Sequence, residues 1–342
     1  MTNPNVSVIV PVYNGTKYID TFFSCLAKQT YQEYEVIIVD DGSVDDTYEK
    51  CLSYSKEDYR IKIFKKENGG PGSARNYGID KASGDYVAFF DIDDEFHQDV
   101  LADNYAYATK NDADIEMWNF KMILHALNGE EIEITKPVGS SFSGEAEEFF
   151  HDYLIPVLDN EMFNPPWNKL IKRSFLNENR LRFSEKYSIY EDILFSYEVL
   201  QKAQRVAIND DFYYSYIIKD SGSLLTTLHK ECFDVILEIY KAALRYGDRF
   251  NQNDKQVIRF KEQFIFLVKG YIKQICINKS LSYTEKRELL STISNNQIYR
   301  NLSKDIDKKS KSVPAKLMMA QHMYKPLIWY YHLIDYIRYG AK

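Results

Sequence analysis

The sequence predicts an α/β fold in which a mainly parallel central sheet is layered with helices, followed by a smaller C-terminal helical region. Two observations support this prediction. Short apolar runs alternate with helical patterns over residues 6–110, as in successive strand–helix–strand units. The runs are also continuous in their apolar character, which is typical of parallel strands buried on both faces. Polar and acidic residues follow several of these runs, at the strand ends where such sheets bind ligands.

The composition is that of a folded, acidic protein. The chain has 342 residues, enough for about two domains, and 45% of them are hydrophobic. Its net charge of −7 argues against a nonspecific nucleic-acid binder, because the phosphate backbone would repel it. The four cysteines are scattered, without the paired spacing of a zinc or redox site, so we expect them to be reduced.

The sequence predicts neither an export signal nor a membrane span. Residues 1–4 are polar and lead directly into a strand, without the charged and apolar regions of a signal peptide. No stretch reaches the roughly 18 apolar residues that a spanning helix needs. We therefore expect a cytoplasmic protein, either free or peripheral at the inner face of the membrane.

The first half of the chain is expected to alternate strands and helices. An apolar run over residues 6–10 is closed by Pro11, which cannot donate to a continuing ladder. The apolar run over residues 34–39 ends in two acids, a turn glycine and a serine (Asp40–Ser43). The other expected elements are helices over 17–28, 46–56 and 99–110, a helix ending at 82, and strands over 60–64 and 86–90.

A glycine-rich loop over residues 68–76 leads into the helix that ends at 82. Backbone N–H groups and the positive end of that helix could meet a phosphate there. The loop is not a dinucleotide-binding fingerprint, because Arg75 occupies the third glycine position, and no P-loop lysine follows. By itself such a loop more often marks only a turn.

Three carboxylates follow the expected strand at residues 86–90. Asp91 and Asp93 face the same side of an extended chain, and Asp94 comes next. Carboxylates this close repel one another unless a cation or a shared proton lies between them, and oxygen ligands suit Mg²⁺ or Mn²⁺. Alone, this stretch is equally compatible with a metal site that holds phosphates and with an acidic turn that caps the next helix.

After about residue 112 the pattern becomes less regular. We expect a strand over 114–124, a polar excursion over 128–143, a helix over 149–158, and a strand over 212–218 with a loop at 220–223. Another helix begins at Glu191 and Asp192. Two acids in a first helical turn are ordinary, because they favour the positive end of the helix, so this pair alone does not indicate a site.

From about residue 230 the chain is expected to be helical. Amphipathic stretches cover 233–246, 257–277 and 284–293. The stretch over residues 318–339 is rich in aromatic and aliphatic residues beside Lys325, His332 and Arg338. We expect it to dock either on a partner subunit, as in a homo-oligomer, or at an anionic membrane surface, with packing against its own chain as the alternative.

Five motifs in order resemble those of the family 2 glycosyltransferases, which have the GT-A fold. They are Val8–Asn14, Val39–Ser43, Asn68–Asn76, Phe90–Asp94 and Glu191–Asp192. The resemblance covers roughly residues 5–225 and implies inverting transfer of a sugar from a nucleotide donor, most often a UDP-sugar, with a divalent metal such as Mn²⁺ or Mg²⁺. It implies a catalytic domain over 1–225, with a nucleotide-sugar half (1–111) and an acceptor half (112–225), before a helical region over 226–342.

The resemblance also implies roles for single residues on the donor side. Asp41 would accept a hydrogen bond from the uracil N–H, and Asp40 would support that turn. Asp91 would lie by the ribose and Asp93 would hold the metal, with Asp94 as a third member of the metal set. The other residues implied in the nucleotide-sugar site are Pro11, Val12, Tyr13, Asn14, Gly69, Gly70, Arg75 and Asn76.

On the acceptor side, Asp192 matches the base that removes a proton from the attacking hydroxyl. Glu191 is the alternative, one residue away. Trp167, Asn168 and Lys169 resemble an acceptor-side segment in which an aromatic face stacks on a sugar, although a core position for Trp167 is as compatible with the sequence.

The implied acceptor is a hydroxyl of a glycan, a lipid-linked glycan, a polymer or a glycoprotein in bacterial cell-surface synthesis. Two other classes stay open. A nucleotidyltransferase shares the acids and the glycine-rich loop, but places that loop after the first strand, where Pro11–Asn14 stand. A non-catalytic scaffold that binds nucleotide sugars would not need its acids, whereas Asp91, Asp93 and Asp192 are all present.

Overall fold

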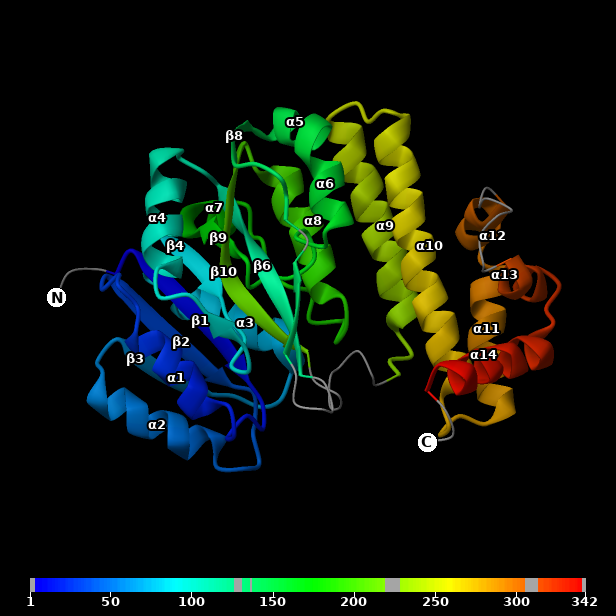
Figure 1. Ribbon diagram of the computed structural model, residues 1–342, viewed down its shortest axis with the longest axis horizontal. Coiled ribbons are helices and arrows are strands. Elements are labelled where there is room, and N and C mark those ends of the chain that lie inside the picture. Colours follow the sequence, from blue (N-terminus) through cyan, green and yellow to red (C-terminus); the bar gives the residue numbers. More distant parts are fainter. Residues whose placement is uncertain (1–3, 126–130, 136, 219–227, 305–312, 340–342) are drawn as a thin grey trace. The chain divides into compact units, whose positions relative to one another are not determined.

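A computed structural model describes residues 4–125, 131–135, 137–218, 228–304 and 313–339 (Figure 1). The expected loop at 220–223 lies outside these residues. The chain divides into two compact units, one of residues 1–220 with 248–251 and one of residues 221–247 with 252–342.

The first unit is built on one ten-stranded sheet with the order β3-β2-β1-β4-β9-β6-β10-β5, to which β7 adds beside β6 and β8 beside β10. The strands are β1 (Val6–Val12), β2 (Tyr34–Asp40), β3 (Ile61–Lys65), β4 (Tyr86–Phe89), β5 (Glu95–Phe96), β6 (Ile115–His125), β7 (Glu131–Thr135), β8 (Phe142–Glu145), β9 (Lys169–Lys172) and β10 (Arg205–Ile218).

The long strands of this sheet run in one direction. β3, β2, β1 and β4 are parallel neighbours. β9 is antiparallel both to β4 and to β6, and β10 is parallel to β6, so β6 and β10 run the same way as β1. The predicted layered α/β fold with a mainly parallel sheet is therefore confirmed, and its antiparallel members are the short strands.

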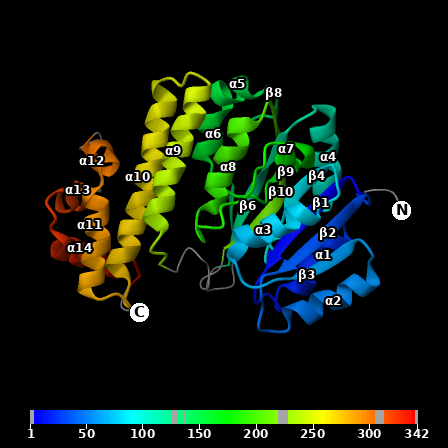
Figure 2. The ribbon, with the colours of Figure 1, turned by 180° about the vertical axis from the view of Figure 1, so that it is seen from behind.

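Helices cover both faces of the sheet. Those of the first unit are α1 (Ile19–Ala27), α2 (Thr47–Glu57), α3 (Gly70–Lys81), α4 (Val100–Lys110), α5 (Ala146–Glu148), the π-helix η1 (Phe149–Tyr153), α6 (Leu154–Asp159), α7 (Arg173–Glu178) and α8 (Glu191–Lys202). Val8 and Val10 of β1 belong to one buried cluster with Phe22 of α1. Ile9 points to the other face, where it meets Gly78 of α3. Figure 2 shows α3 on this face of the sheet.

Three expectations about this unit are corrected. Pro11 does not end β1. Its missing N–H would matter only on the side of β4, and the pairing of β1 with β4 already stops at Ile9, whereas the pairing with β2 continues. β1 therefore continues through the half-buried Pro11 to the buried Val12. The polar excursion contains β7, an exposed edge strand without a buried face, and β8. The strand β9 was missed because it has only four residues.

The second unit is helical, as expected. Its helices are α9 (Cys232–Arg249), α10 (Asp254–Ile277), α11 (Tyr283–Asn295), α12 (Gln297–Lys304), α13 (Val313–Ala320) and α14 (Tyr324–Tyr339). α10 packs against α11, α12 and α14, and α13 packs against α14. Asn253 and Ser282 begin α10 and α11 with reciprocal capping boxes. Among the residues described here, no helix is long and apolar enough to cross a lipid bilayer.

Candidate active site

Asp41 stands at the carboxyl end of β2, where the sheet meets the glycine-rich loop. Its N–H continues the ladder by donating to the Val12 carbonyl at 2.8 Å. Its buried carboxylate accepts hydrogen bonds from the N–H groups of Gly69 (3.0 Å) and Gly70 (2.7 Å) and from Lys66 Nζ (2.8 Å). An anion is favoured there because the first N–H groups of α3 lack carbonyl partners within the helix. Asp41 thus fixes the loop, and its contact with uracil remains a prediction.

The turn after β2 is tied to the turn after β1. The Ser43 N–H donates to Asp40 Oδ1 at 2.9 Å, and the Asn14 N–H donates to Ser43 Oγ at 2.9 Å. Asn14 has a φ of 50°, a left-handed conformation that asparagine tolerates well. The neighbouring Tyr13 is exposed. These expected nucleotide-site residues lie at one edge of the sheet, with the ring of Tyr13 open to a ligand.

A tyrosine of β10 holds the acidic motif. Tyr214 Oη accepts a hydrogen bond from the Asp91 N–H (3.0 Å) and donates one to Asp94 Oδ2 (3.1 Å). Asp94 Oδ1 accepts the N–H of Ile217 at 2.9 Å. Burial, reinforced by the charges of Asp91 and Asp93, raises the pKa of Asp94 well above its ordinary value. Asp94 therefore acts as a buried brace between the motif and β10.

Asp93 lines a pocket of about 160 Å³ in the first unit. The other lining residues are Tyr18 and Thr21 of α1, Ile217 of β10, and the neighbours of Asp93 within residues 92–95. The volume is smaller than the roughly 300 Å³ at which pockets begin to enclose a whole drug-sized ligand. The pocket therefore fits one part of a nucleotide sugar, and Asp93 faces it.

Arg75 of α3 connects the acidic motif to the start of α8. Its Nη2 lies 3.1 Å from Asp91 Oδ1, and its Nη1 lies 3.0 Å from Glu191 Oε1. Burial opposes the charge of Arg75, but the carboxylates of Asp91 and Glu191 outweigh this effect and raise its pKa. Losing both acids would leave the buried guanidinium without an ion-paired opposite charge. This arginine is 116 positions from Glu191 in the sequence.

Asp192 differs from Glu191 although the two are adjacent. It is half-buried, and its Oδ1 accepts the N–H of Ile193 at 2.8 Å. Burial and the negative charge of Glu191 raise the pKa of Asp192 to about 7, against the opposing charges of Arg75 and Lys169. A carboxylate with a pKa near neutrality can take a proton from a hydroxyl group more readily than an ordinary aspartate. Glu191 is an ion-pair partner, whereas Asp192 has the pKa of a general base.

Burial and the negative charges of the acidic motif (Asp91, Asp93 and Asp94) and of Asp192 raise the pKa of Tyr216 to about 12. The geometric link between the donor-side acids and the candidate base is Arg75, which lies 3.1 Å from Asp91 and 3.0 Å from Glu191, the neighbour of Asp192 in the sequence.

Asn76 faces the interior and holds the segment before α8. Its Nδ2 donates to the Phe183 carbonyl (2.9 Å) and to Glu185 Oε1 (3.0 Å), and its Oδ1 accepts the Phe183 N–H (2.8 Å). Gly72 allows α3 to approach the same segment, because a Cβ at this position would lie 3.2 Å from Phe183 Cβ and from the Ser184 carbonyl oxygen. Asn76 is therefore a structural residue of the site, and a direct nucleotide contact remains a prediction.

The three expected acceptor-side residues are buried. Trp167 stacks on Tyr214 with ring centroids 4.4 Å apart, so the core position is the one it occupies. Asn168 donates to two backbone carbonyls, at 3.2 and 3.0 Å. Lys169 Nζ donates to backbone carbonyls, one of them 3.2 Å away, and burial lowers the pKa of Lys169 to about 7. Their burial argues against direct contact with an acceptor and favours a supporting role behind the acidic motif.

Two residues of the site were missed by the sequence analysis. Lys66 follows β3 directly, at the same sheet edge as Asp41, and this position was the available signal. Tyr214 lies in a run of aromatic residues (213–216) that predicts a strand equally well without any role in the site. Its contact with Asp91 depends on strand pairing across more than 100 residues, for which the sequence carries no local signal.

The donor set fits a hard divalent cation in part. Within the described residues, no three His, Cys, Asp or Glu side chains are arranged to hold a metal ion. Both Asp94 oxygens accept hydrogen bonds from β10, Asp93 lines the pocket, and Asp91 has one carboxylate oxygen 3.1 Å from Arg75. Mg²⁺ is commonly held by one or two carboxylates together with substrate phosphates and water. Two carboxylates therefore suffice if a diphosphate supplies further ligands.

The fold and the site define a class of protein. A loop-fixing acid, an acidic motif with Asp93 at the pocket and a separate acid with a pKa near 7 suit group transfer from a phosphate-bearing donor to a hydroxyl acceptor. Known proteins agree with this class. The chain is 26% identical to the cholesterol galactosyltransferase of Borreliella burgdorferi over 298 residues. The alignment covers 84% of this chain and 82% of that protein.

Two further similarities extend over nearly the whole chain. The poly(ribitol-phosphate) beta-N-acetylglucosaminyltransferase TarP of Staphylococcus aureus is 27% identical over 313 residues, 89% of this chain and 90% of that protein. The crystal structure of S. aureus TarS 1–349 in complex with UDP-GlcNAc superposes with a TM-score of 0.69 at 20% identity, covering 98% of this chain and 92% of that one. At this identity the structural likeness shows the shared GT-A fold.

The sequence model of the Glycosyl transferase family 2 matches residues 7–179, and the chain belongs to this family. It is a glycosyltransferase, which confirms the resemblance read from the five motifs. Neither the nucleotidyltransferase nor the non-catalytic scaffold is needed to explain the site.

Proposed function

We propose that this glycosyltransferase moves a sugar from a UDP-sugar to a hydroxyl group with inversion, using Asp192 as the general base. One observation carries the proposal. Arg75 joins Asp91 to Glu191 within 3.1 Å, and the adjacent Asp192 has a pKa raised to about 7 by burial and by the charge of Glu191. A donor-side acid and a tuned base are thus connected through one buried guanidinium.

The donor is proposed to bind along the sheet edge formed by the ends of β1, β2 and β4. The exposed ring of Tyr13 offers a face for the base, and Asp41 holds the start of α3 at the same edge of the sheet. UDP as the nucleotide is supported by the UDP-GlcNAc complex of TarS, whose fold this chain shares.

Asp91 and Asp93 would hold a divalent cation, Mn²⁺ or Mg²⁺, beside the 160 Å³ pocket that Asp93 lines. When bound, the cation would offset the negative charge that develops on the departing diphosphate. Asp94, Tyr214 and the N–H of Ile217 would keep the backbone of the motif in place during the reaction.

Asp192 would accept the proton of the acceptor hydroxyl as its oxygen attacks the anomeric carbon. The negative charge of Glu191 beside it strengthens this tendency, because it disfavours the ionised form of Asp192 and so raises its proton affinity. Arg75 limits the effect by neutralising Glu191 in part, which keeps Asp192 ionised in a useful fraction of molecules near neutral pH.

The acceptor is proposed to be a hydroxyl of a cell-surface glycan or polymer, its lipid-linked precursor, or a glycoprotein. The names of the similar proteins, which act on cholesterol and on poly(ribitol-phosphate), support a hydroxyl on a large or lipid-associated molecule. A cytoplasmic location is proposed with it, since a nucleotide sugar is the donor.

A donor panel tests the proposal. The full chain is incubated with UDP-sugars and with GDP- and TDP-sugars, with Mn²⁺ or with chelator, and released nucleoside diphosphate is measured. We expect release from one or more UDP-sugars that depends on the metal and is lost in Asp192→Asn when acceptor is present. Release only from another nucleotide sugar would overturn the choice of UDP.

A further inference from the structure

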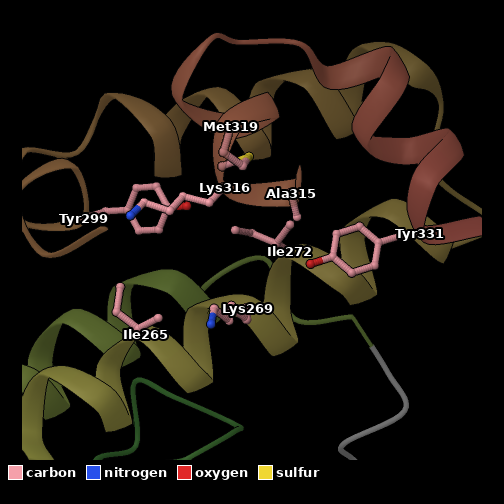
Figure 3. Close-up of a pocket in the computed structure, with 8 residues that line it drawn as sticks. All are labelled: Ile265, Lys269, Ile272, Tyr299, Ala315, Lys316, Met319 and Tyr331. Atoms are coloured by element: carbon pink, nitrogen blue, oxygen red, sulfur yellow. The ribbon is translucent and has the colours of Figure 1, made fainter. Parts of the chain in front are cut away.

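The helix α14 has two different faces. One face packs inside the second unit, where Leu327 is fully buried. Figure 3 shows Tyr331 of α14 pointing toward Ile272 of α10, across a pocket of about 20 Å³. This contact anchors α14 on α10, so the orientation of its opposite face is set by packing.

The opposite face is apolar and exposed. Trp329 and Ile337 are 67% and 72% exposed, and Leu333 and Tyr336 are exposed as well. The four residues follow the spacing i, i+4, i+7 and i+8, which places them in one stripe along the helix. A stripe of large side chains this exposed on a soluble surface indicates an interaction site, because single exposed apolar residues are common and contiguous ones are not.

The charges around this stripe are cationic. Lys325 and His332 are exposed on α14, and the one acid of this helix, Asp335, is half-buried with its Oδ1 3.5 Å from Lys273 Nζ. Over residues 297–342 the sequence has nine lysines and arginines against three acids, whereas the whole chain has a net charge of −7. The segment that carries the stripe therefore has a net positive charge in an acidic protein.

We propose that the α14 stripe (Trp329, Leu333, Tyr336 and Ile337) docks on an anionic lipid membrane, with the helix lying in the plane of the interface. Tryptophan and tyrosine suit this zone because they combine an apolar ring with a polar group. The adjacent Lys325 side chain would meet anionic headgroups, which adds to the affinity of the apolar residues. This inference does not depend on the proposed reaction.

A second copy of the chain fits the same stripe less well. In a two-fold symmetric contact the same surface meets itself, so the Lys325 side of one copy would approach like charges of the other. The nearby Asp335 is already paired with Lys273 and would not offset them. An anionic membrane meets both the apolar and the cationic character of the face.

The tryptophans allow a direct measurement. The chain has three, and Trp118 and Trp167 are buried, so quenching of fluorescence by added acrylamide reports mainly on Trp329. Vesicles of phosphatidylcholine with phosphatidylglycerol should shift the emission to shorter wavelength and protect it from acrylamide. Vesicles of phosphatidylcholine alone should do so much less, and about 0.5 M salt should weaken the effect.

Flotation with the same vesicles measures the fraction of each variant that binds. Trp329→Glu combined with Ile337→Glu should lower the bound fraction about tenfold or more. Phe266→Glu is the control, because Phe266 is 73% exposed on α10, outside the stripe, and should float like the wild type. Unchanged thermal unfolding of the double variant shows that it is folded.

Three results would overturn the proposal. The first is equal binding of the double variant and the control. The second is that the wild type does not bind vesicles but forms a dimer in analytical ultracentrifugation, and that the double variant is monomeric. This result would assign the stripe to a contact with a second copy. The third is that the wild type does not bind vesicles and that the double variant has a lower melting temperature than the wild type. This result would assign the stripe to packing within the chain itself.

Discussion

Arg75 is a buried side chain whose ion pairs distinguish the two adjacent acids Glu191 and Asp192. It pairs with Glu191 and with Asp91 and leaves Asp192 with a pKa raised to about 7. Adjacent acids that look alike in the sequence therefore have separate tasks, and substitutions should distinguish them.

We expect Asp192→Asn to lower sugar transfer about 10²-fold or more, because an amide of the same shape cannot accept the proton. Its affinity for UDP in the presence of metal should stay close to that of the wild type. Calorimetric titration with UDP beside a product assay measures both. Asp93→Ala is the contrasting variant and should weaken UDP binding and transfer together.

Glu191→Gln is the matched control for Asp192→Asn. It removes a charge from the buried pair with Arg75, so we expect a loss of about 1–3 kcal/mol in the free energy of unfolding, measured by denaturant titration. Near-normal transfer by Asp192→Asn, together with an inactive but folded Glu191→Gln, would move the base to Glu191.

The pH dependence of transfer follows from the raised pKa of Asp192. The base must be ionised, so kcat/KM should fall about tenfold per pH unit below pH 7 and level off above it. The folded state binds this proton more tightly than the unfolded chain, in which the pKa is near 3.8. The contribution of Asp192 to stability is therefore present at low pH and is lost as pH rises from about 4 to about 7. Asp192→Asn should flatten both profiles, and an unchanged kcat/KM profile would contradict the assignment.

At the scale of elements, strand β10 positions the acidic motif. Tyr214→Phe removes the hydroxyl that contacts the Asp91 N–H and Asp94, so metal-dependent UDP binding should weaken. Tyr213→Phe is the control, because the hydroxyl of Tyr213 donates to Asp103 Oδ2 at 3.0 Å and does not contact the motif. Both variants should lose about 1 kcal/mol of stability. Calorimetry with UDP and Mn²⁺ should separate them, and equal binding would show that Tyr214 only supports the fold.

The start of α3 depends on the backbone of Gly70. Its φ is +84°, and a Cβ placed there would meet no atom within 4 Å, so any cost of Gly70→Ala is conformational. We expect a loss of about 1–2 kcal/mol in unfolding free energy. Gly139→Ala is the control, since a Cβ there is equally free of contacts and its φ is not positive. Equal stability of the two variants would contradict this account.

At the scale of the whole molecule, the donor should stabilise the first unit. UDP with Mn²⁺ or Mg²⁺ binds the folded state, so it should raise the melting temperature, and a chelator should remove the shift. Thermal unfolding of the full chain measures this effect. An equal shift with chelator present would contradict the role of Asp91 and Asp93 as metal ligands.

Much of the fold could be predicted because its signals are local. The apolar runs of β1, β2 and β4 and the acids that follow them are close in the sequence, and parallel strands gather such ends at one edge. Short or edge strands were missed, since β9 has only four residues and β7 has no buried face. Periodicity needs length and a buried side to be visible.

The site could be predicted as a set of residues but not as an arrangement. The burial of Trp167, Asn168 and Lys169 was open from the sequence, because an aromatic beside prolines is typical both of a core and of a sugar-binding surface. The engagement of Asp41 by the glycine-rich loop also depends on a contact across 29 residues.

The sequence by itself determined the α/β class, the family motifs, and the position of Asp192 at the start of a helix. Only the tertiary structure decided that Glu191 pairs with Arg75 while Asp192 has a pKa near 7, that Tyr214 and Asp94 brace the motif, and that the apolar stripe of α14 faces outward. The physical reason is that secondary structure follows from neighbouring residues, whereas ion pairing, burial and pKa depend on distances between residues that are far apart in the chain.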